Sequence, residues 1–455
     1  MSQHSSSIET LIDNYAVPVP RYTSYPTAPN FHEGVNADDF AGWIAAIDPS
    51  ASLSLYVHIP FCDTLCWFCG CNTKMTRRYD PVEAYLPSLY TEISQVSDTL
   101  PCGPKVTHIH WGGGSPTILS ASDIRDLAAE IRRHFDVARD AEFAVEIDPR
   151  GLDIDRVRAM AEAGVTRASI GVQDFEEKVQ SAINRRQSYE ETRQAVEWLR
   201  TQSISAINID MMYGLPHQDM ASISRTADQV VSLEPDRIAL FGYAHVPWIK
   251  RHQLMIDDDI LPGKMQRFEQ AQGAAEQLVE AGYCQIGLDH FAKPQDRLAQ
   301  AQASGVLKRN FQGYTTDKAD GLIGLGASSI SCLPQGYCQN ETAVARYRDA
   351  LTRGGLATAK GVRLGADDVI RRWVIEQLMC DYTFSSSDLT ANFGSDIEAV
   401  LNDAGDLEGF EQDGMVERTA DGFRVTDTGR PFVRAICARF DTYLDRKKIR
   451  HSAAV

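Results

Sequence analysis

Residues 53–71 read LSLYVHIPFCDTLCWFCGC, an apolar run of strand character followed at once by a cluster of cysteines. The cluster contains Cys62, Cys66, Cys69 and Cys71, four of the ten cysteines in the chain. Three thiolates at the spacing C-x3-C-x2-C, in a loop that leaves a strand, can bind three irons of a 4Fe-4S cluster. The fourth iron then lacks a protein ligand. The spacing therefore predicts an iron-sulfur cluster with one iron open to a second molecule.

Zinc is the alternative for such a group of cysteines. A structural zinc ion takes four tetrahedral ligands, usually from two pairs that are well separated in the sequence. Here one loop of ten residues would have to surround the ion alone. The spacing favours the cluster and leaves zinc as the alternative.

Five further strand-like runs follow the first one between residues 106 and 244. They read VTHIHW, EFAVEI, RASIGV, ISAINIDMM and RIALFGYA, and amphipathic stretches such as residues 81–96 and 121–135 lie between them. Strands that alternate with helices predict a parallel sheet, either doubly wound or a barrel. Six units are fewer than the eight of a closed barrel. We therefore expect an α/β fold, a partial (β/α)6 barrel of the TIM type that is open on one side.

Polar or glycine-rich residues follow these runs. GGGSP at 112–116 follows the second run, Glu146 and Asp148 end the third, Gln173 follows the fourth and Asp210 lies in the fifth. The loops after the strands of a barrel converge on one face. These residues are therefore predicted to share one site with the cysteines.

The alternation of strand-like runs and helical stretches does not extend to either end of the chain. We expect an N-terminal arm at 1–52, the partial barrel at 53–290, an extension that completes the catalytic domain at 291–364, and a small, mostly helical domain at 365–455. The arm carries VPRYTSYPTAPNF and shows no helical period. In the last domain VIRRWVIEQLM indicates a helix, SSSDL opens another, and MVERTADGFRVT predicts a hairpin with its turn at Ala-Asp-Gly. Helices followed by a hairpin are typical of a winged-helix-like domain.

The composition excludes several classes of partner. The chain has 62 acidic and 45 basic residues and a formal net charge of −17, so it repels nucleic acid and anionic lipid unless cations gather locally. Its first residues do not resemble a secretory leader, and it has no apolar run of about 18 residues. We expect a cytoplasmic protein with neither nucleic acid nor membrane as a partner.

The cysteine motif, with an aromatic residue before its last cysteine, resembles the signature of the radical S-adenosylmethionine (SAM) superfamily. Longer stretches resemble one of its families, the oxygen-independent coproporphyrinogen III oxidases, over about residues 15–440. These stretches are PRYTSYPTA, YVHIPFC, CGCN, HIHWGGGSP, SIGVQDF, INIDMMYGLP, FGYAHVP, KRNFQGYTT and GVRL.

The resemblance implies an enzyme of heme biosynthesis. In this family a 4Fe-4S cluster and two SAM molecules serve the oxidative decarboxylation of two propionates of coproporphyrinogen III to vinyl groups, which gives protoporphyrinogen IX. The hydrogen is removed by a 5′-deoxyadenosyl radical. The resemblance also implies an electron donor of the flavodoxin or ferredoxin type and an electron acceptor that the sequence does not identify. We expect a monomer.

The resemblance also implies roles for individual residues. Cys62, Cys66 and Cys69 would bind the cluster, and Cys71, Tyr56 and Gln312 would act in catalysis. The SAM contacts would be Tyr56, Phe68, Gly113, Gly114, Ser115, Glu146, Gln173, Arg185, Asp210, Ala244 and Ile330. Arg21, Phe311 and Gln312 would bind the substrate, and its propionates could also meet Lys74, Arg77, Arg78, Lys308 and Arg309. Ser115 departs from the threonine that is more frequent in the family, but it keeps the hydroxyl.

Two other functions compete with this one. A heme chaperone of the same fold shares the three cysteines, but it generally lacks the fourth cysteine and the PRYTSYPTA arm, both of which this chain has. A structural zinc protein that uses its C-terminal domain on nucleic acid is the third hypothesis.

Overall fold

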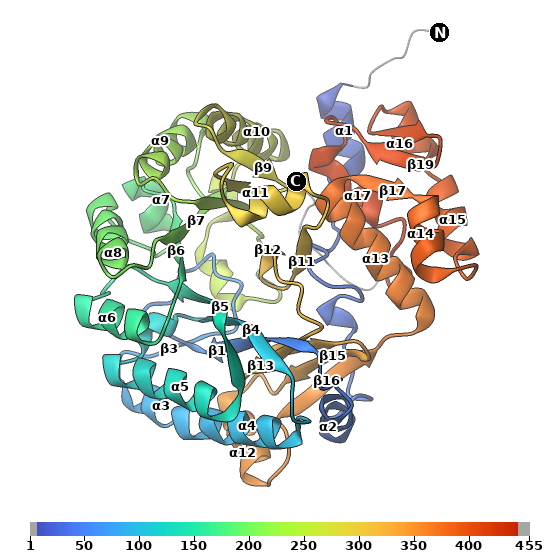
Figure 1. The fold of residues 1–455 in the computed structure, drawn as a ribbon. Helices are drawn as coiled ribbons and strands as arrows, with labels where there is room; N and C mark the ends of the chain where they lie inside the picture. Colours follow the sequence, from blue (N-terminus) through green and yellow to red (C-terminus); the bar gives the residue numbers. More distant parts are fainter. Residues whose placement is uncertain (1–6, 445–455) are drawn as a thin grey trace.

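The computed structural model describes residues 7–444 and is built around one mixed sheet of twelve strands (Figure 1). The strand order is β16-β15-β14-β13-β1-β4-β5-β6-β7-β8-β10-β9. Six neighbouring strands in the middle run parallel to one another. They are β1 (Ser52–Ile59), β4 (Lys105–Gly113), β5 (Asp136–Ile147), β6 (Arg167–Gln173), β7 (Ala206–Tyr213) and β8 (Arg237–Gly242). The six predicted strands and their parallel order are confirmed.

The sheet continues beyond these six strands at both edges. On one side β13 (Gly321–Leu325) pairs in parallel with β1, and β14 (Ile330–Leu333), β15 (Gly336–Asn340) and β16 (Thr358–Arg363) follow in antiparallel order. On the other side β10 (His290–Ala292) and β9 (Cys284–Ile286) continue antiparallel from β8. The expected boundary after residue 290 therefore falls inside a strand, because the extension is part of the same sheet.

Helices cover the outer face of the parallel strands (Figure 1). They form because apolar side chains recur at helical spacing: in α5 the residues Ile124, Leu127, Ala128 and Ile131 are all buried. Ser120 caps this helix by accepting from the backbone N–H of Asp123 at 3.1 Å. The outer helices are α4 (Leu86–Thr99), α5 (Ala121–His134), α6 (Ile154–Glu162), α8 (Tyr189–Thr201), α9 (Met220–Ser232) and α10 (Lys264–Glu280). Shorter elements are α3 (Asp80–Glu83), α7 (Glu177–Ala182), α11 (Arg297–Ala303), α12 (Val344–Thr352), β2 (Phe61–Cys62), β3 (Lys74–Met75), β11 (Lys308–Asn310) and β12 (Gly313–Thr315).

The N-terminal arm is more helical than its sequence indicates. It contains α1 (Ile8–Tyr15) and α2 (Ala37–Ala45), so the expectation of no helical period was wrong for these two segments. The reason is local capping, since Ser7 and Asn36 each accept a backbone N–H of the first turn. α1 packs into the hydrophobic cluster of the C-terminal domain. The arm is thus attached to the last part of the chain.

The C-terminal domain has a core of its own beside the barrel (Figure 1). The predicted hairpin is confirmed as β18 (Val416–Thr419) and β19 (Gly422–Val425), and β17 (Thr383–Ser385) adds an unpredicted third strand. Its helices are α13 (Ala366–Asp381), α14 (Ser386–Phe393), α15 (Glu398–Gly405), α16 (Glu408–Gln412) and α17 (Val433–Cys437). Within residues 7–444 no helix is both long and apolar enough to cross a membrane.

Candidate active site

The four clustered cysteines line one cavity of about 160 Å³. The loop that carries them begins at the end of β1 and is fixed at its base, where β2 pairs with β3. The same cavity is lined by residues in or just after β4, β5 and β6 and by Asp210 within β7. The predicted convergence of the strand ends on the cysteine loop is therefore what the fold produces.

Each of three cysteine sulfurs receives a hydrogen bond. Thr73 Oγ1 donates to Cys62 Sγ at 3.2 Å, Arg150 Nη2 to Cys66 Sγ at 3.3 Å, and the backbone N–H of Cys71 to Cys69 Sγ at 3.3 Å. Donors of this kind stabilise sulfur that carries negative charge, as it does when it binds iron.

The thiols differ in acidity. Burial raises the pKa of Cys62 to about 12. Hydrogen bonding from Cys71 lowers the pKa of Cys69 to about 7, although burial acts in the opposite direction. The thiolate, which is the metal-binding form, is therefore favoured at Cys69 more than at Cys62. Cys71 is exposed, whereas Cys66 is buried.

The glycine loop after β4 passes through a space that no larger residue would fit. A Cβ on Gly114 would lie 2.5 Å from the carbonyl oxygen of Phe61, and one on Gly113 would lie 2.7 Å from the His58 ring. Gly113 also has φ +118°, a conformation that favours glycine. The backbone N–H of Ser115 donates to Phe61 at 2.8 Å, which holds the glycine loop against the base of the cysteine loop.

Glu146, at the end of β5, is bound to this glycine loop. Its Oε2 accepts the N–H of Gly113 at 3.1 Å, and its Oε1 lies 3.2 Å from His110 Nε2. Burial alone would raise the pKa of Glu146, but these two contacts lower it below its usual value. Glu146 is therefore ionised at neutral pH and can accept a hydrogen bond from a ligand.

Tyr56 lies on β1 behind the cysteine loop. Its ring stacks on His110 with 5.8 Å between centroids, and its hydroxyl lies 3.0 Å from His58 Nδ1. The other nitrogen of His58 lies 2.9 Å from the carbonyl oxygen of Asn72, just after the fourth cysteine. Both histidines lie inside motifs quoted from the sequence, His58 in YVHIPFC and His110 in HIHWGGGSP. Neither was predicted as a site residue.

A carboxylate and two arginines form a second connection to the cysteines. Asp148 pairs with Arg150 at 2.6 Å and with Arg185 at 3.4 Å, and both arginines also reach Cys66 Sγ. Burial would raise the pKa of Asp148, but the charges of the two arginines lower it. Arg185 was predicted, whereas Arg150 was missed because it lies three residues beyond the end of β5.

Asp210, on β7, also lines the cavity. Ser169 and Asn208 donate to its carboxylate at 3.3 and 2.8 Å, and burial raises its pKa to about 6. Gln173 and Ser115 also line the cavity. Gln173 has φ +71°, so the backbone turns sharply at the end of β6.

Phe68 lines the cavity, and Ala244 lies outside its lining after β8. Gln253 connects the two, because its Nε2 donates to both of their carbonyl oxygens. Sequence reasoning missed Gln253, which lies in the short 3-10 helix Arg251–Met255 and is 1% exposed.

The remaining predicted residues are placed away from the cysteine cavity. Ile330 on β14 and Phe311 pack beside an aromatic cluster that contains Tyr337. Phe311 lines a separate cavity of about 440 Å³, together with residues 22–25 of the arm. Gln312 is exposed in the turn between β11 and β12.

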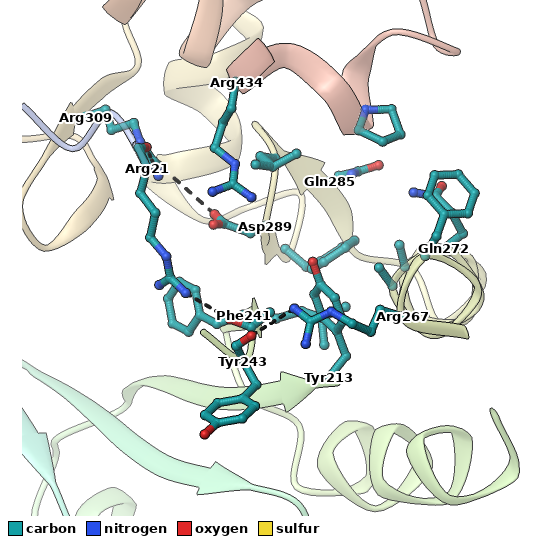
Figure 2. A pocket seen from close by; sticks show the side chains of 18 residues that line it. Arg21, Tyr213, Phe241, Tyr243, Arg267, Gln272, Gln285, Asp289, Arg309 and Arg434 are labelled. Carbon is teal, nitrogen blue, oxygen red and sulfur yellow. Dashed lines mark hydrogen bonds and ion pairs between the residues drawn. The ribbon is translucent and has the colours of Figure 1, made fainter. Parts of the chain in front are cut away.

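The six candidate cations divide into two groups. Arg21 and Arg309 meet at a small cavity drawn in Figure 2, and Lys308 pairs with Glu376 at 3.3 Å. The other three are exposed, and Arg78 pairs with Asp80 at 3.8 Å; they are Lys74, Arg77 and Arg78.

Comparisons with known proteins agree with this geometry. Residues 56–230 match the model of the Radical SAM superfamily, and residues 364–432 match the HemN C-terminal domain. An oxygen-independent coproporphyrinogen III oxidase of Bradyrhizobium diazoefficiens is 48% identical, covering 96% of this chain and 97% of its own. One from Pseudomonas aeruginosa is 43% identical, covering 95% of each chain. This chain belongs to the oxygen-independent coproporphyrinogen III oxidases.

A solved structure of this family supports the assignment of the fold. Coproporphyrinogen III oxidase (HemN) from Escherichia coli, described as a radical SAM enzyme, is 40% identical and superposes with a TM-score of 0.89. The match covers 93% of this chain and 98% of the other. The expected radical SAM barrel with its additional C-terminal domain is therefore the fold of this coproporphyrinogen oxidase family member.

The donor set fits the cofactors that the radical SAM family implies. Three thiols face one cavity, each with a hydrogen-bond donor at its sulfur, and Glu146 and Arg185 present both signs of charge nearby. In the described part of the chain no three His, Cys, Asp or Glu side chains are arranged to hold a single metal ion. The arrangement suits a 4Fe-4S cluster with SAM beside it.

Proposed function

We propose that this chain catalyses the oxygen-independent oxidative decarboxylation of two propionates of coproporphyrinogen III to vinyl groups, which yields protoporphyrinogen IX for heme biosynthesis. The observation that carries the proposal is the cysteine cavity, in which the C-x3-C-x2-C thiols face the ends of four successive parallel strands. The near full-length likeness to coproporphyrinogen III oxidases supports this substrate.

Cys62, Cys66 and Cys69 would hold the 4Fe-4S cluster in this proposal. When bound, the cluster and SAM would supply the radical chemistry that removes a hydrogen atom from the propionate side chain. Thr73 and Arg150 keep the sulfurs in place through the hydrogen bonds described above.

The polar residues of the cavity position SAM. Glu146 and Gly113 lie together on one side, where a carbonyl or carboxylate can accept from the ammonium of SAM's methionine part. Arg185 can pair with the carboxylate. Asp210 accepts hydrogen bonds from Ser169 and Asn208 and offers a further polar contact. We infer that two SAM molecules bind, with Phe68, Ser115, Gln173, Ala244 and Ile330 as further contacts.

The catalytic roles of Cys71, Tyr56 and Gln312 are part of the same proposal. Cys71 is exposed at the edge of the cysteine cavity, where a thiol can meet a substrate. Tyr56 is held by His58 and His110, so its position is fixed. In this proposal Phe311, Gln312 and Arg21 of the arm contact the substrate.

The proposal extends to the setting of the reaction. We infer a cytoplasmic monomer that takes electrons from a flavodoxin or ferredoxin and passes them to an acceptor that is still to be identified. In this proposal the chain comprises an arm up to residue 52, a barrel whose sheet continues through the extension to residue 364, and a C-terminal domain. Residues 1–6 and 445–455 of the first and last parts lie outside the described residues.

An anaerobic assay tests the function. Reconstituted protein receives SAM, a reductant, coproporphyrinogen III and a cell extract that supplies an acceptor, and both 5′-deoxyadenosine and protoporphyrinogen are followed. We expect both products to form together. Tight retention of heme without a vinyl product would instead support the heme chaperone.

A further inference from the structure

The end of β6 carries a strained turn. Gln173 has φ +71°, and the backbone N–H of Asp174 donates to the carbonyl oxygen of Val172 at 3.0 Å, so the chain makes a γ-turn around Gln173. A γ-turn with positive φ at its centre is rare and strained. Such strain persists only where neighbouring contacts fix the backbone, and it is frequent at functional sites. The strained residue here lines the cysteine cavity.

Asp174, the residue after the turn, anchors it from behind. It is 1% exposed and is not among the residues that line the cavity. Three neutral groups donate to its carboxylate, namely the amide of Gln218 at 2.6 Å, the backbone N–H of Glu176 at 2.6 Å and the hydroxyl of Thr226 at 3.2 Å. Burial raises the pKa of Asp174 to about 6, although these bonds act in the opposite direction. The carboxylate is therefore mostly ionised at neutral pH, and its charge strengthens the bonds that fix the turn.

The buried amide of Gln180, in α7, joins the turn to the loop that follows. Its Oε1 accepts the backbone N–H of Gln187 at 3.0 Å. Its Nε2 donates to the carbonyl oxygens of Gln187 and Asp174 at 2.5 and 2.9 Å, so both of its N–H groups are used. One side chain thus holds the two ends of the loop 180–187 together and fastens them to the residue after the turn.

Three successive residues of this loop lie at the cysteine site. The carbonyl oxygen of Ile183 accepts the backbone N–H of Trp67 at 2.9 Å. The side-chain amide of Asn184 donates to the carbonyl oxygen of Leu65, also at 2.9 Å. Arg185 follows, and it lines the cavity. The loop that Gln180 closes is therefore bonded to the backbone of the cysteine loop.

Arg185 is held by contacts that leave one donor for a ligand. Its backbone N–H donates to the carbonyl oxygen of Gln180 at 2.9 Å, and its Nη2 donates to that of Gly171 at 2.5 Å. Its Nε is buried and has no hydrogen-bond partner within the described residues. A ligand-binding group must be kept close to its productive position by the residues behind it. For Arg185 that support includes Gln180.

We propose that Asp174 and Gln180 are positioning residues that hold the turn at Gln173 and the loop of Arg185 in the geometry that binds SAM. This inference rests on the proposed function, in which Gln173 and Arg185 contact SAM. Neither Asp174 nor Gln180 lines the cavity, so both act through the backbone that they fix. Asp174 lies in the quoted motif SIGVQDF, but neither residue was predicted for the site.

SAM binding and hydrogen exchange test the inference without an activity assay. Gln180→Met keeps the length of the side chain but removes its three hydrogen bonds, and Asp174→Asn keeps the shape but turns one acceptor into a donor. In anaerobically reconstituted protein, each variant is expected to raise the Kd for SAM, per bound cluster, about tenfold. In the same protein without SAM, the backbone amides of residues 173–187 should exchange with deuterium faster, whereas distant strands should not change.

Gln302→Met is the matched control. Gln302, in α11, is also an amide that bonds two backbone groups, since its Nε2 donates to the carbonyl oxygen of Gln285 at 2.9 Å and its Oε1 accepts the N–H of Gly287 at 2.8 Å. These contacts lie at β9, on the edge of the sheet, and none of the three residues lines the cysteine cavity. We expect faster exchange at residues 285–287 and an unchanged Kd for SAM.

The possible failures are separable. An unaltered Kd for SAM in both Asp174→Asn and Gln180→Met would overturn the inference, and so would unaltered exchange at residues 173–187. An equal loss of SAM binding in Gln302→Met would show a general effect of lower stability and would also overturn it. If either variant does not fold, Gln180→Glu, which keeps the acceptor for the N–H of Gln187, takes its place, and a Kd equal to that of the unchanged protein would count against the inference in the same way. Absence of vinyl product from an unchanged protein that binds SAM would instead reject the proposed function, and the binding and exchange results would still stand.

Discussion

The carbonyl oxygens of Phe68 and Ala244 accept hydrogen bonds from the same amide nitrogen, that of Gln253, at 2.9 and 3.1 Å. Phe68 precedes the last cluster cysteine, and Ala244 follows the last parallel strand. One buried amide therefore sets the distance between the two ends of the site.

Replacing Gln253 by Leu should loosen the cysteine loop. The change leaves the two carbonyls and the N–H of Val246, which now donates to Gln253 at 2.5 Å, without their partner. Each buried polar group left unsatisfied costs about 1–3 kcal/mol. We expect a lower melting temperature and a lower iron content after reconstitution. Gln412→Leu, which removes only an exposed contact to Glu408, is the matched control. An unchanged iron content would show that this amide does not hold the loop.

The cysteines should separate into two classes when replaced singly. Cys62→Ala, Cys66→Ala and Cys69→Ala should each abolish the 4Fe-4S absorption and most of the bound iron. Cys71→Ser should retain both but lose vinyl formation, because Cys71 is the exposed thiol of the four. Iron and sulfide analysis after anaerobic reconstitution makes the comparison. Loss of the cluster in the Cys71 variant would instead make Cys71 a ligand.

Asp210 should make the protein less stable at neutral pH than at acid pH. Burial raises its pKa from 3.8 to about 6, so the folded state binds a proton more tightly than the unfolded state does. This contribution to stability is present below about pH 4 and is lost as the pH rises to about 6. Asp210→Asn cannot ionise, so it should be more stable above pH 6 by about 1–3 kcal/mol and nearly equal near pH 4. Urea unfolding at several pH values measures the difference. A gain that is constant with pH would contradict the assignment.

Two glycines should respond in opposite ways to alanine. Gly114→Ala would bring a Cβ within 2.5 Å of the Phe61 carbonyl oxygen, so the loop must move, at a cost of about 1–3 kcal/mol. Gly42 lies in α2, and a Cβ added to it would meet no atom within 4 Å outside the backbone of its own helix. Gly42→Ala should therefore raise the free energy of unfolding by about 1 kcal/mol through helix propensity. Thermal unfolding of both variants, with SAM binding by the first, provides the measurement. Equal stability of the two variants would show that the close approach at Gly114 is relieved without cost.

The parallel strands and the cysteine loop were predictable because their signals are local. An apolar run, its period and the polar residue that ends it all lie within a few positions, as in EFAVEI and Glu146. The hairpin at residues 416–425 was predictable for the same reason. The caps of α1 and α2 are also local, but they were overlooked among the prolines and tyrosines of the arm.

The contacts that complete the site were not predictable, because they join positions far apart in the chain. Arg150 and Arg185 reach one sulfur from different loops, and Gln253 reaches Phe68 from a short 3-10 helix. No period or spacing marks such a residue. Gln312 is the opposite case. Its motif predicted a role in the site, but the residue is exposed on a turn away from the cysteine cavity.

The packing of α1 into the core of the C-terminal domain has a consequence for biosynthesis. The first helix of a nascent chain leaves the ribosome long before the residues that it packs against. The core that these two segments share can therefore close only at the end of translation.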